Sequence, residues 1–109
     1  MSAAPKARQW QRLRWLMLEA VYHNHRSQGH RFDMLDLLSV LQTYNSQLGT
    51  NQVITLLQEL GPKGSEFIRY EKKTDAKSGE TFLYQVEITP KGRQYFEGRQ
   101  DDPRLHYVE

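Results

Sequence analysis

Three histidines in one short stretch are the residues whose types most directly suggest chemistry. His23, His25 and His30 lie just before Asp33, and imidazole nitrogens with a carboxylate form a donor set that holds transition metals. His23 and His25 are two residues apart, however, and side chains at that spacing point to different sides of a helix. We therefore interpret the histidines as polar surface residues near a helix end and predict no metal site.

The other reactive side chains form no catalytic pattern. The chain has no cysteine, which excludes a thiolate nucleophile, a thiolate metal site and a disulfide framework. No Ser/His/Asp order, no pair of catalytic carboxylates and no phosphate-binding glycine loop stands out. A chain of 109 residues also leaves little room for both a core and an enclosed pocket. We predict a protein that is not an enzyme and that uses no cofactor.

The charged residues are distributed unevenly, although they sum to only +2. Residues 1–31 carry six Lys or Arg and one acidic residue, whereas residues 32–60 carry three acidic residues and no Lys or Arg. Residues 61–88 and 89–109 are each balanced. A basic first segment favours attraction to a polyanion such as nucleic acid.

The overall composition is that of a soluble domain. Hydrophobic residues make up 38% of the chain and aromatic residues 11%, which is enough apolar surface to form a core. No apolar run reaches the ~18 residues that a membrane span needs, and the N-terminus lacks the apolar segment of a signal peptide. We expect one cytoplasmic domain without a membrane partner.

Apolar residues at helical spacing predict three helices in the first 60 residues, at 9–27, 33–46 and 51–60. Asp33 and Thr50 are the expected N-caps of the second and third helices, because their side chains accept backbone N–H groups. The core-facing residues expected on these two helices are Leu35, Leu37, Leu38, Leu41, Tyr44, Val53, Ile54, Leu57 and Leu60.

The hydrophobic period changes after the glycine and proline residues at 61–64. Residues 67–73 and 80–88 are typical of two β-strands joined by a polar turn. Thr89 then precedes a proline, which predicts the N-cap and first residue of a short helix at 90–97. The inward residues expected on these elements are Phe82, Tyr84, Val86, Ile88, Tyr95 and Phe96.

This order of elements resembles the winged-helix domain of bacterial and archaeal transcriptional regulators, in the broad PadR-like and MarR-like sense. The second and third helices are separated by a short turn containing Gly49, which is the spacing of a helix-turn-helix. The third helix and residues 84–96 carry the resemblance. The latter look like a last wing strand running into the T-x-x-G-R helix start of such regulators, matched by Thr89, Gly92 and Arg93.

The resemblance implies an α+β winged helix-turn-helix fold, with three helices, a β-hairpin wing and a short C-terminal helix. We place this domain at residues 9–98. Residues 1–8 are then a flexible basic N-terminal arm, and residues 99–109 are a C-terminal tail.

The resemblance also makes the third helix the recognition helix. Asn and Gln can form paired hydrogen bonds with adenine in the major groove, and Thr can contact the thymine methyl group. Basic residues of the wing and the arm would contact phosphates. The residues expected to contact DNA are Thr50, Asn51, Gln52, Thr55, Gln58, Lys72, Lys73, Lys77, Lys6, Arg8, Arg12 and Arg14. The prediction is sequence-specific binding of double-stranded DNA by a small transcriptional regulator.

The charge of the helix-turn-helix departs from that of a usual DNA reader. Residues 32–60 contain no Lys or Arg, whereas a DNA reader normally neutralises phosphates beside its recognition helix. The alternative is therefore a winged-helix protein–protein interaction module that does not bind DNA. In that case the polar residues of the third helix are a solvated face.

A second apolar stripe on the first helix lies roughly opposite its core-facing side. It consists of Trp15, Leu18 and Tyr22. It could pack on the end of the same chain, for instance on Leu105 or Tyr107, or on a second copy of the chain across a two-fold axis. We favour the second arrangement and predict a homodimer with this stripe at its interface.

Overall fold

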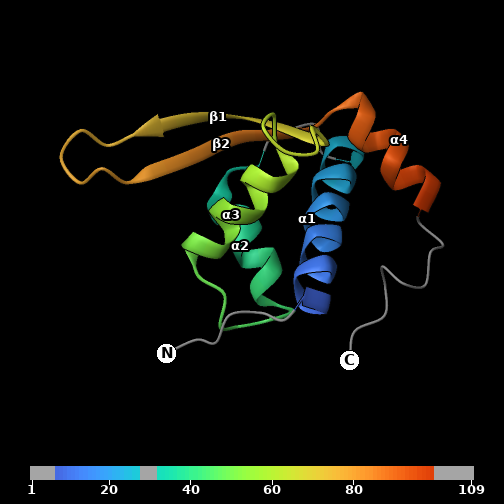
Figure 1. Ribbon diagram of the computed structural model, residues 1–109, viewed down its shortest axis with the longest axis horizontal. Helices are drawn as coiled ribbons and strands as arrows, with labels where there is room; N and C mark the ends of the chain where they lie inside the picture. The colour runs from blue at the N-terminus through green and yellow to red at the C-terminus, as the bar shows by residue number, and fades with distance from the viewer. Residues whose placement is uncertain (1–6, 28–31, 100–109) are drawn as a thin grey trace.

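Six elements follow one another along residues 7–27 and 32–99, the part of the chain that the computed structural model describes. They are α1 (Ala7–Ser27), α2 (Met34–Gln42), α3 (Thr50–Leu60), β1 (Ile68–Thr74), β2 (Thr81–Ile88) and α4 (Pro90–Arg99) (Figure 1). Within this part the architecture is α+β, with four helices and a two-stranded antiparallel hairpin. The order is compatible with a winged helix. The predicted N-terminal arm up to Lys6 and the tail from residue 100 lie outside the described residues.

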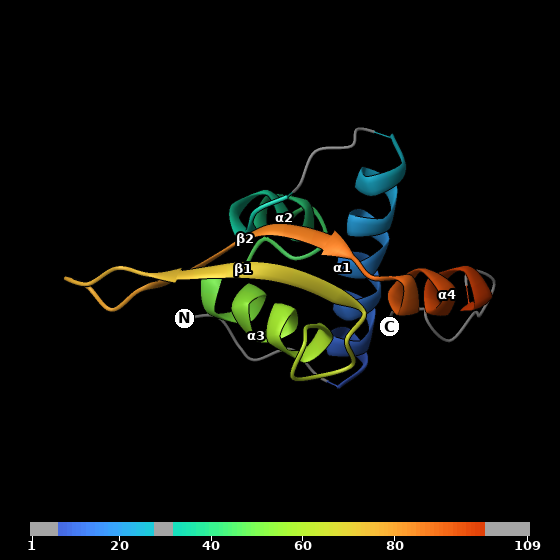
Figure 2. The ribbon, with the colours of Figure 1, turned by 90° about the horizontal axis from the view of Figure 1, so that it is seen from above.

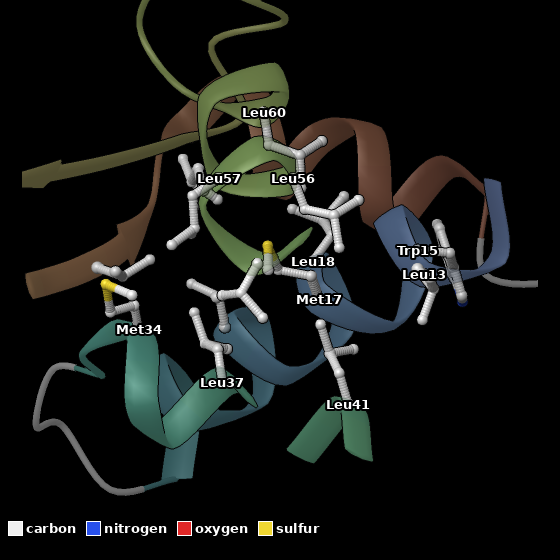
Figure 3. Close-up of a cluster of buried hydrophobic side chains, with 14 of the residues drawn as sticks. Leu13, Trp15, Met17, Leu18, Met34, Leu37, Leu41, Leu56, Leu57 and Leu60 are labelled. Carbon is white, nitrogen blue, oxygen red and sulfur yellow. The ribbon is translucent and has the colours of Figure 1, made fainter. Parts of the chain in front are cut away.

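Helix α1 forms the centre of the core because apolar residues occupy most of its circumference. Leu13, Met17 and Val21 recur every four residues and are at most 1% exposed, so they line one side of the helix. Figure 3 shows Met17 of α1 among the leucines of α2 and α3. The buried leucines that face α1 from these two helices are Leu37, Leu41, Leu56, Leu57 and Leu60.

Helix α4 covers the second apolar stripe of α1. Trp15, Leu18 and Tyr22 are 2%, 1% and 4% exposed. The Phe96 ring stacks on both aromatic rings of the stripe, with centroid distances of 4.6 Å to Trp15 and 4.4 Å to Tyr22. Tyr22 Oη donates a hydrogen bond to Glu97 Oε2 at 2.7 Å. The prediction of a dimer interface at these three residues is therefore wrong, because their surface is already buried within one chain.

The first turns of α2 and α3 are capped differently. At α2 the predicted N-cap is confirmed: the Asp33 carboxylate accepts the Asp36 N–H at 2.9 Å, and the Asp36 carboxylate accepts the Asp33 N–H at 3.0 Å. At α3 the N-cap is Gly49, with extended backbone, and Thr50 is the first helical residue. The Gln52 side chain accepts the Gly49 N–H at 2.9 Å, so the capping group lies inside the helix rather than at its entrance.

Helix α2 is shorter than the predicted 33–46 and buries a different set of residues. It ends at Gln42, whose side-chain amide donates to the Leu48 carbonyl at 2.9 Å. Leu35 is expected in the core but is 50% exposed, because at about 100° per residue it lies on the side of α2 away from the buried Leu37 and Leu41. The buried stripe of α2 is Met34, Leu37 and Leu41, and that of α3 is Val53, Leu56, Leu57 and Leu60.

A bulge changes which residues of β2 face the core. The pairing of β1 and β2 is broken once, where Gln85 adopts a φ of 52° and adds one residue to β2. Val86 and Ile88, between the bulge and the base of the hairpin, are buried as expected. On the tip side of the bulge Leu83 is 1% exposed, whereas Phe82 and Tyr84 are only half-buried. One extra residue exchanges the two faces of a strand across the bulge, so strict alternation predicts the wrong residues on the tip side.

The hairpin is anchored at its base and free at its tip. Val86 N donates to the Phe32 carbonyl at 2.8 Å, just before α2 begins, and Leu83 N lies 3.3 Å from the Met34 sulfur. Residues 71–80 are all exposed. Figures 1 and 2 show this part of the hairpin projecting well past the helices.

The connection from β2 to α4 depends on a close approach of two backbone segments. Thr89 Oγ1 accepts the Gly92 N–H at 3.0 Å and donates to the Glu66 carbonyl at 2.7 Å, which confirms Thr89 as the cap of the helix. A Cβ atom at Gly92 would lie 2.0 Å from the Phe67 carbonyl oxygen. Glycine at this position therefore lets α4 start directly against the residue that precedes β1.

Two glycine substitutions in α4 test this close approach. Gly92→Ala is expected to lower the free energy of unfolding by about 2–3 kcal/mol, because the Phe67 backbone has to move. Gly98→Ala is the matched control, since an added Cβ there meets nothing within 4 Å, and it is expected to stabilise the helix by about 0.5–1 kcal/mol. Urea denaturation measures both. Two changes of the same sign would contradict the packing described above.

Candidate nucleic-acid interface

The exposed face of α3 carries hydrogen-bonding side chains without charge. Asn51, Thr55 and Gln58 are all exposed, and their spacing of four and three residues places them along one side of the helix. Thr55 Oγ1 donates to the Asn51 carbonyl at 3.0 Å, so the hydroxyl retains acceptor capacity toward the outside. Amides in such a row can pair with the edges of bases or with polar groups of a protein.

The two other residues predicted on this face are placed differently from one another. Thr50 is exposed in the first turn of α3. Gln52 is half-buried, and its side-chain oxygen is engaged by the Gly49 N–H. Gln52 therefore stabilises the start of the helix, and its side-chain oxygen is not available to a partner.

The three predicted lysines lie on the projecting part of the hairpin. Lys72, Lys73 and Lys77 are exposed. Lys73 Nζ lies over two aromatic rings, 5.3 Å from the centroid of Phe82 and 5.5 Å from that of Tyr84, an arrangement in which the cation is attracted to the ring faces. Lys72 and Lys77 have no such contact among the described residues, so they are the cations most available to an external anion.

A concavity of about 830 Å³ separates the first turn of α3 from the hairpin. Its walls include Thr50 and Asn51 on the helix side, and Lys73 and Phe82 on the hairpin side. The structure thus brings together residues that are more than 20 positions apart in the sequence. Backbone N–H groups at the start of a helix favour a nearby anion, as does Lys73, whereas Asp75 and Glu80, which also line the concavity, oppose it.

The basic residues of the first helix are not gathered at this concavity. Arg14 forms two hydrogen bonds with the Glu59 carboxylate of α3, at 3.2 and 3.3 Å. Arg8 is exposed at the start of α1, Arg12 is half-buried, and Lys6 lies outside the described residues. No local pattern predicts the Arg14–Glu59 pair, because the two residues are 45 positions apart.

The hairpin tip contains a carboxylate that stays ionised. The pKa of Asp75 lies below its usual range because the Ser78 hydroxyl donates to the carboxylate at 2.8 Å and the Lys77 backbone N–H does so at 3.3 Å. The negative charge offsets part of the positive field of the neighbouring lysines. Residues 68–88 contain four basic and four acidic residues, so the hairpin has no net charge.

Removing one hydroxyl tests this account of the tip. Ser78→Ala is expected to raise the pKa of Asp75 toward its ordinary value, whereas Ser78→Thr, which keeps the hydroxyl, is expected to leave it low. Because the folded pKa is depressed, the stabilisation from these bonds is present at neutral pH and is lost as the pH falls through that pKa. A ¹³C NMR titration of the carboxyl group measures it. An unchanged midpoint in Ser78→Ala would contradict the assignment.

No group of three His, Asp or Glu side chains that could hold a metal ion comes together in the part of the chain that the structure describes. His23 is exposed and lies edge-on to the Tyr22 and Phe96 rings, with centroid distances of 5.4 and 5.9 Å. The side chain of His25 and the whole of His30 lie outside the description.

Among the described residues, no helix combines the length and the apolar character that a membrane span requires.

Comparison of the chain with protein-family models, with curated proteins and with solved structures finds no match.

Proposed function

We propose that the protein is a small winged-helix transcriptional regulator that binds double-stranded DNA through α3 and the β1–β2 hairpin. The observation that carries the proposal is the exposed, uncharged stripe of Asn51, Thr55 and Gln58 beside a hairpin that projects past the helices. A recognition helix needs hydrogen-bond donors and acceptors that face outward. The hairpin beside it needs cations that reach the phosphate backbone of the DNA. The two requirements are met here by adjacent elements.

The dimensions of α3 suit the major groove. A groove about 12 Å wide admits one α-helix. The stripe from Asn51 to Gln58 extends over about 10 Å at 1.5 Å per residue, which corresponds to about three base-pair steps of 3.4 Å. Three side chains over three steps match the usual density of base contacts by such a helix.

Phosphate contacts in this proposal come from the hairpin and from the start of α3. Lys72 and Lys77 are exposed at the tip, and the first turn of α3 lines the concavity opposite Lys73. Since α2 and α3 contain no Lys or Arg, few phosphates are neutralised. We therefore expect modest affinity for random DNA and a shallow dependence on salt concentration.

Charge reversal on the hairpin tests the phosphate contacts. The double variant Lys72→Glu, Lys77→Glu is expected to weaken binding of a labelled duplex at least tenfold at low salt, and to reduce the slope of log K against log salt by about 2. The matched control Lys91→Glu, Arg99→Glu makes the same change in charge on α4, at the other end of the molecule (Figure 1). Fluorescence anisotropy measures both. An equal loss in the control would indicate unspecific attraction.

Substitutions on α3 test base reading separately. After a preferred duplex has been selected from a random pool, Asn51→Ala and Gln58→Ala are each expected to weaken binding to it by about 1–3 kcal/mol while changing binding to random DNA little. Gln94→Ala, an exposed glutamine of α4, is the matched control and should leave both affinities unchanged. Failure of the wild-type chain to shift any duplex at micromolar concentration would overturn the proposed function.

A protein-binding module is the second candidate, and α2 favours it. Leu35 and Val40 are the large hydrophobic residues of the described chain that remain 50% and 38% exposed. The single charge on α3, Glu59, is already paired with Arg14. Because Leu35 also lines the concavity beside α3 and Val40 does not, Val40→Ser is the variant expected to weaken binding to a protein partner and to leave DNA binding intact.

A further inference from the structure

One exposed side of α4 lies at the end of the molecule opposite the hairpin tip (Figures 1 and 2). Lys91, Gln94 and Gly98 are exposed there, and their spacing of three and four residues places them along one side of the helix. We call this surface the α4 face; it consists of Phe67, Lys91, Gln94, Tyr95, Gly98 and Arg99, which line a concavity of about 630 Å³. None of these residues lines the concavity between α3 and the hairpin, so a duplex at that concavity leaves the α4 face accessible.

The charged side chains of the α4 face are all positive. They are Lys91 and Arg99, and neither forms an ion pair with a carboxylate of the residues that the structure describes. The one acidic residue of α4, Glu97, accepts a hydrogen bond from Tyr22 of α1 and does not line the concavity. The α4 face is therefore complementary to a negatively charged partner.

The two cations are held over a pair of stacked aromatic rings. The centroids of the half-buried Phe67 and Tyr95 rings are 4.3 Å apart. Lys91 Nζ lies 5.9 Å from the Phe67 centroid, and Arg99 Cζ lies 4.6 Å from the Tyr95 centroid. Attraction to a ring face uses none of the N–H donors of these cations. The cations are therefore oriented but still able to bind an anion, which lowers the entropy that binding costs.

The spacing of the cations along the helix fits a short extended peptide. Lys91 and Arg99 are eight residues apart on α4, which is about 12 Å at 1.5 Å per residue. In an extended chain, side chains four residues apart lie on the same side and are separated by about 13 Å. The side chain midway between them also points to this side, where it meets the two rings.

We propose that the α4 face binds an acidic segment of a second protein in extended conformation. Its two carboxylates, four residues apart, pair with Lys91 and Arg99, and an apolar side chain between them packs on Phe67 and Tyr95. The partner is thus recognised at the end of the molecule away from α3, so it can be held while DNA is bound. The peptide interaction itself does not depend on DNA binding.

Gln94 favours a peptide over a single-stranded nucleic acid. It lies between the two cations along the helix, and its side-chain amide both donates and accepts hydrogen bonds. An extended peptide presents free backbone N–H and C=O groups that match such an amide. A nucleic acid carries a phosphate at every nucleotide, whereas the centre of the α4 face is an uncharged pair of rings.

The site is tested by NMR on the full ¹⁵N-labelled chain, without DNA. The probe is the peptide Gly-Asp-Ser-Phe-Ser-Asp-Gly, blocked at both ends, in which the two carboxylates and the ring lie on one side of the extended chain. Millimolar peptide is expected to shift the Gly98 backbone resonance and the Gln94 side-chain resonances progressively. The resonance of Gly79, at the hairpin tip, is expected to stay in place. A Gly98 resonance that does not move, or a Gly79 resonance that moves as far, overturns the proposal.

Two altered peptides separate specific pairing from general attraction of charge. Replacing both aspartates of the probe by asparagine is expected to weaken binding about fivefold, as the loss of two exposed ion pairs implies. Inserting one more serine after the phenylalanine keeps the charge but moves the second carboxylate to the other side of the extended chain. This peptide is expected to bind about threefold more weakly. Equal binding of the probe and either altered peptide overturns the proposed pairing.

Substitutions in the chain test which cations hold the peptide. The double variant Lys91→Gln, Arg99→Gln is expected to weaken binding of the probe about fivefold, and both side chains are exposed, so the fold is retained. The matched control Lys72→Gln, Lys77→Gln removes the same charge from the hairpin and should bind the probe as the wild-type chain does. Equal affinities of the two double variants overturn the assignment.

Two further measurements decide between this partner and other occupants of the α4 face. Pentathymidylate is expected to shift the Gly98 resonance less than the probe does at the same concentration. A larger shift would assign the face to nucleic acid and overturn the proposal. Nuclear Overhauser effects from the Tyr95 ring to residues 100–109 in the free protein would assign the face to the chain itself and would overturn it as well.

Discussion

The burial of α1 on two sides is the constraint on which the rest of the structure depends. A helix that is apolar around most of its circumference must be covered by more than one element. Helices α2 and α3 cover one side, and the ring of Phe96 covers the other by stacking on Trp15 and Tyr22. The hairpin is the connection that brings the chain from α3 to α4, so its base is fixed by the same requirement that fixes the helices.

The sequence predicts the order of the helices and strands better than it predicts which side chains of each element face the core. The period of the apolar residues and the caps gave the order of helices and strands, because both signals are local. The bulge at Gln85 changes the inward residues only on the tip side of β2, where Leu83 is buried instead of Phe82 and Tyr84, and alternation alone does not locate one extra residue. The prediction that the stripe of Trp15, Leu18 and Tyr22 is buried is correct. The predicted partner, a second copy of the chain, is wrong, because nothing in a single helix shows which distant element packs on it.

The candidate interface, too, can be predicted only in part from the sequence. The outward stripe of α3 could be predicted, since it follows from helical spacing alone. The engagement of Gln52 as a cap and of Arg14 by Glu59 could not, because these are tertiary or backbone contacts of particular side chains. The concavity between α3 and the hairpin is likewise made by elements far apart in the sequence.

The contrast between the anchored base of the hairpin and its exposed tip bears on how such a molecule can diverge. Residues 71–80 bury no side chain, so changes of length and charge there cost little in folding free energy and are the kind of variation that surface loops tolerate. Gly92 and Phe96 have no comparable freedom, because Gly92 packs on the Phe67 backbone and the Phe96 ring holds α4 against α1. Related chains that diverge from one ancestor can therefore acquire different partners through substitutions in residues 71–80 alone, while the helices and their packing stay the same.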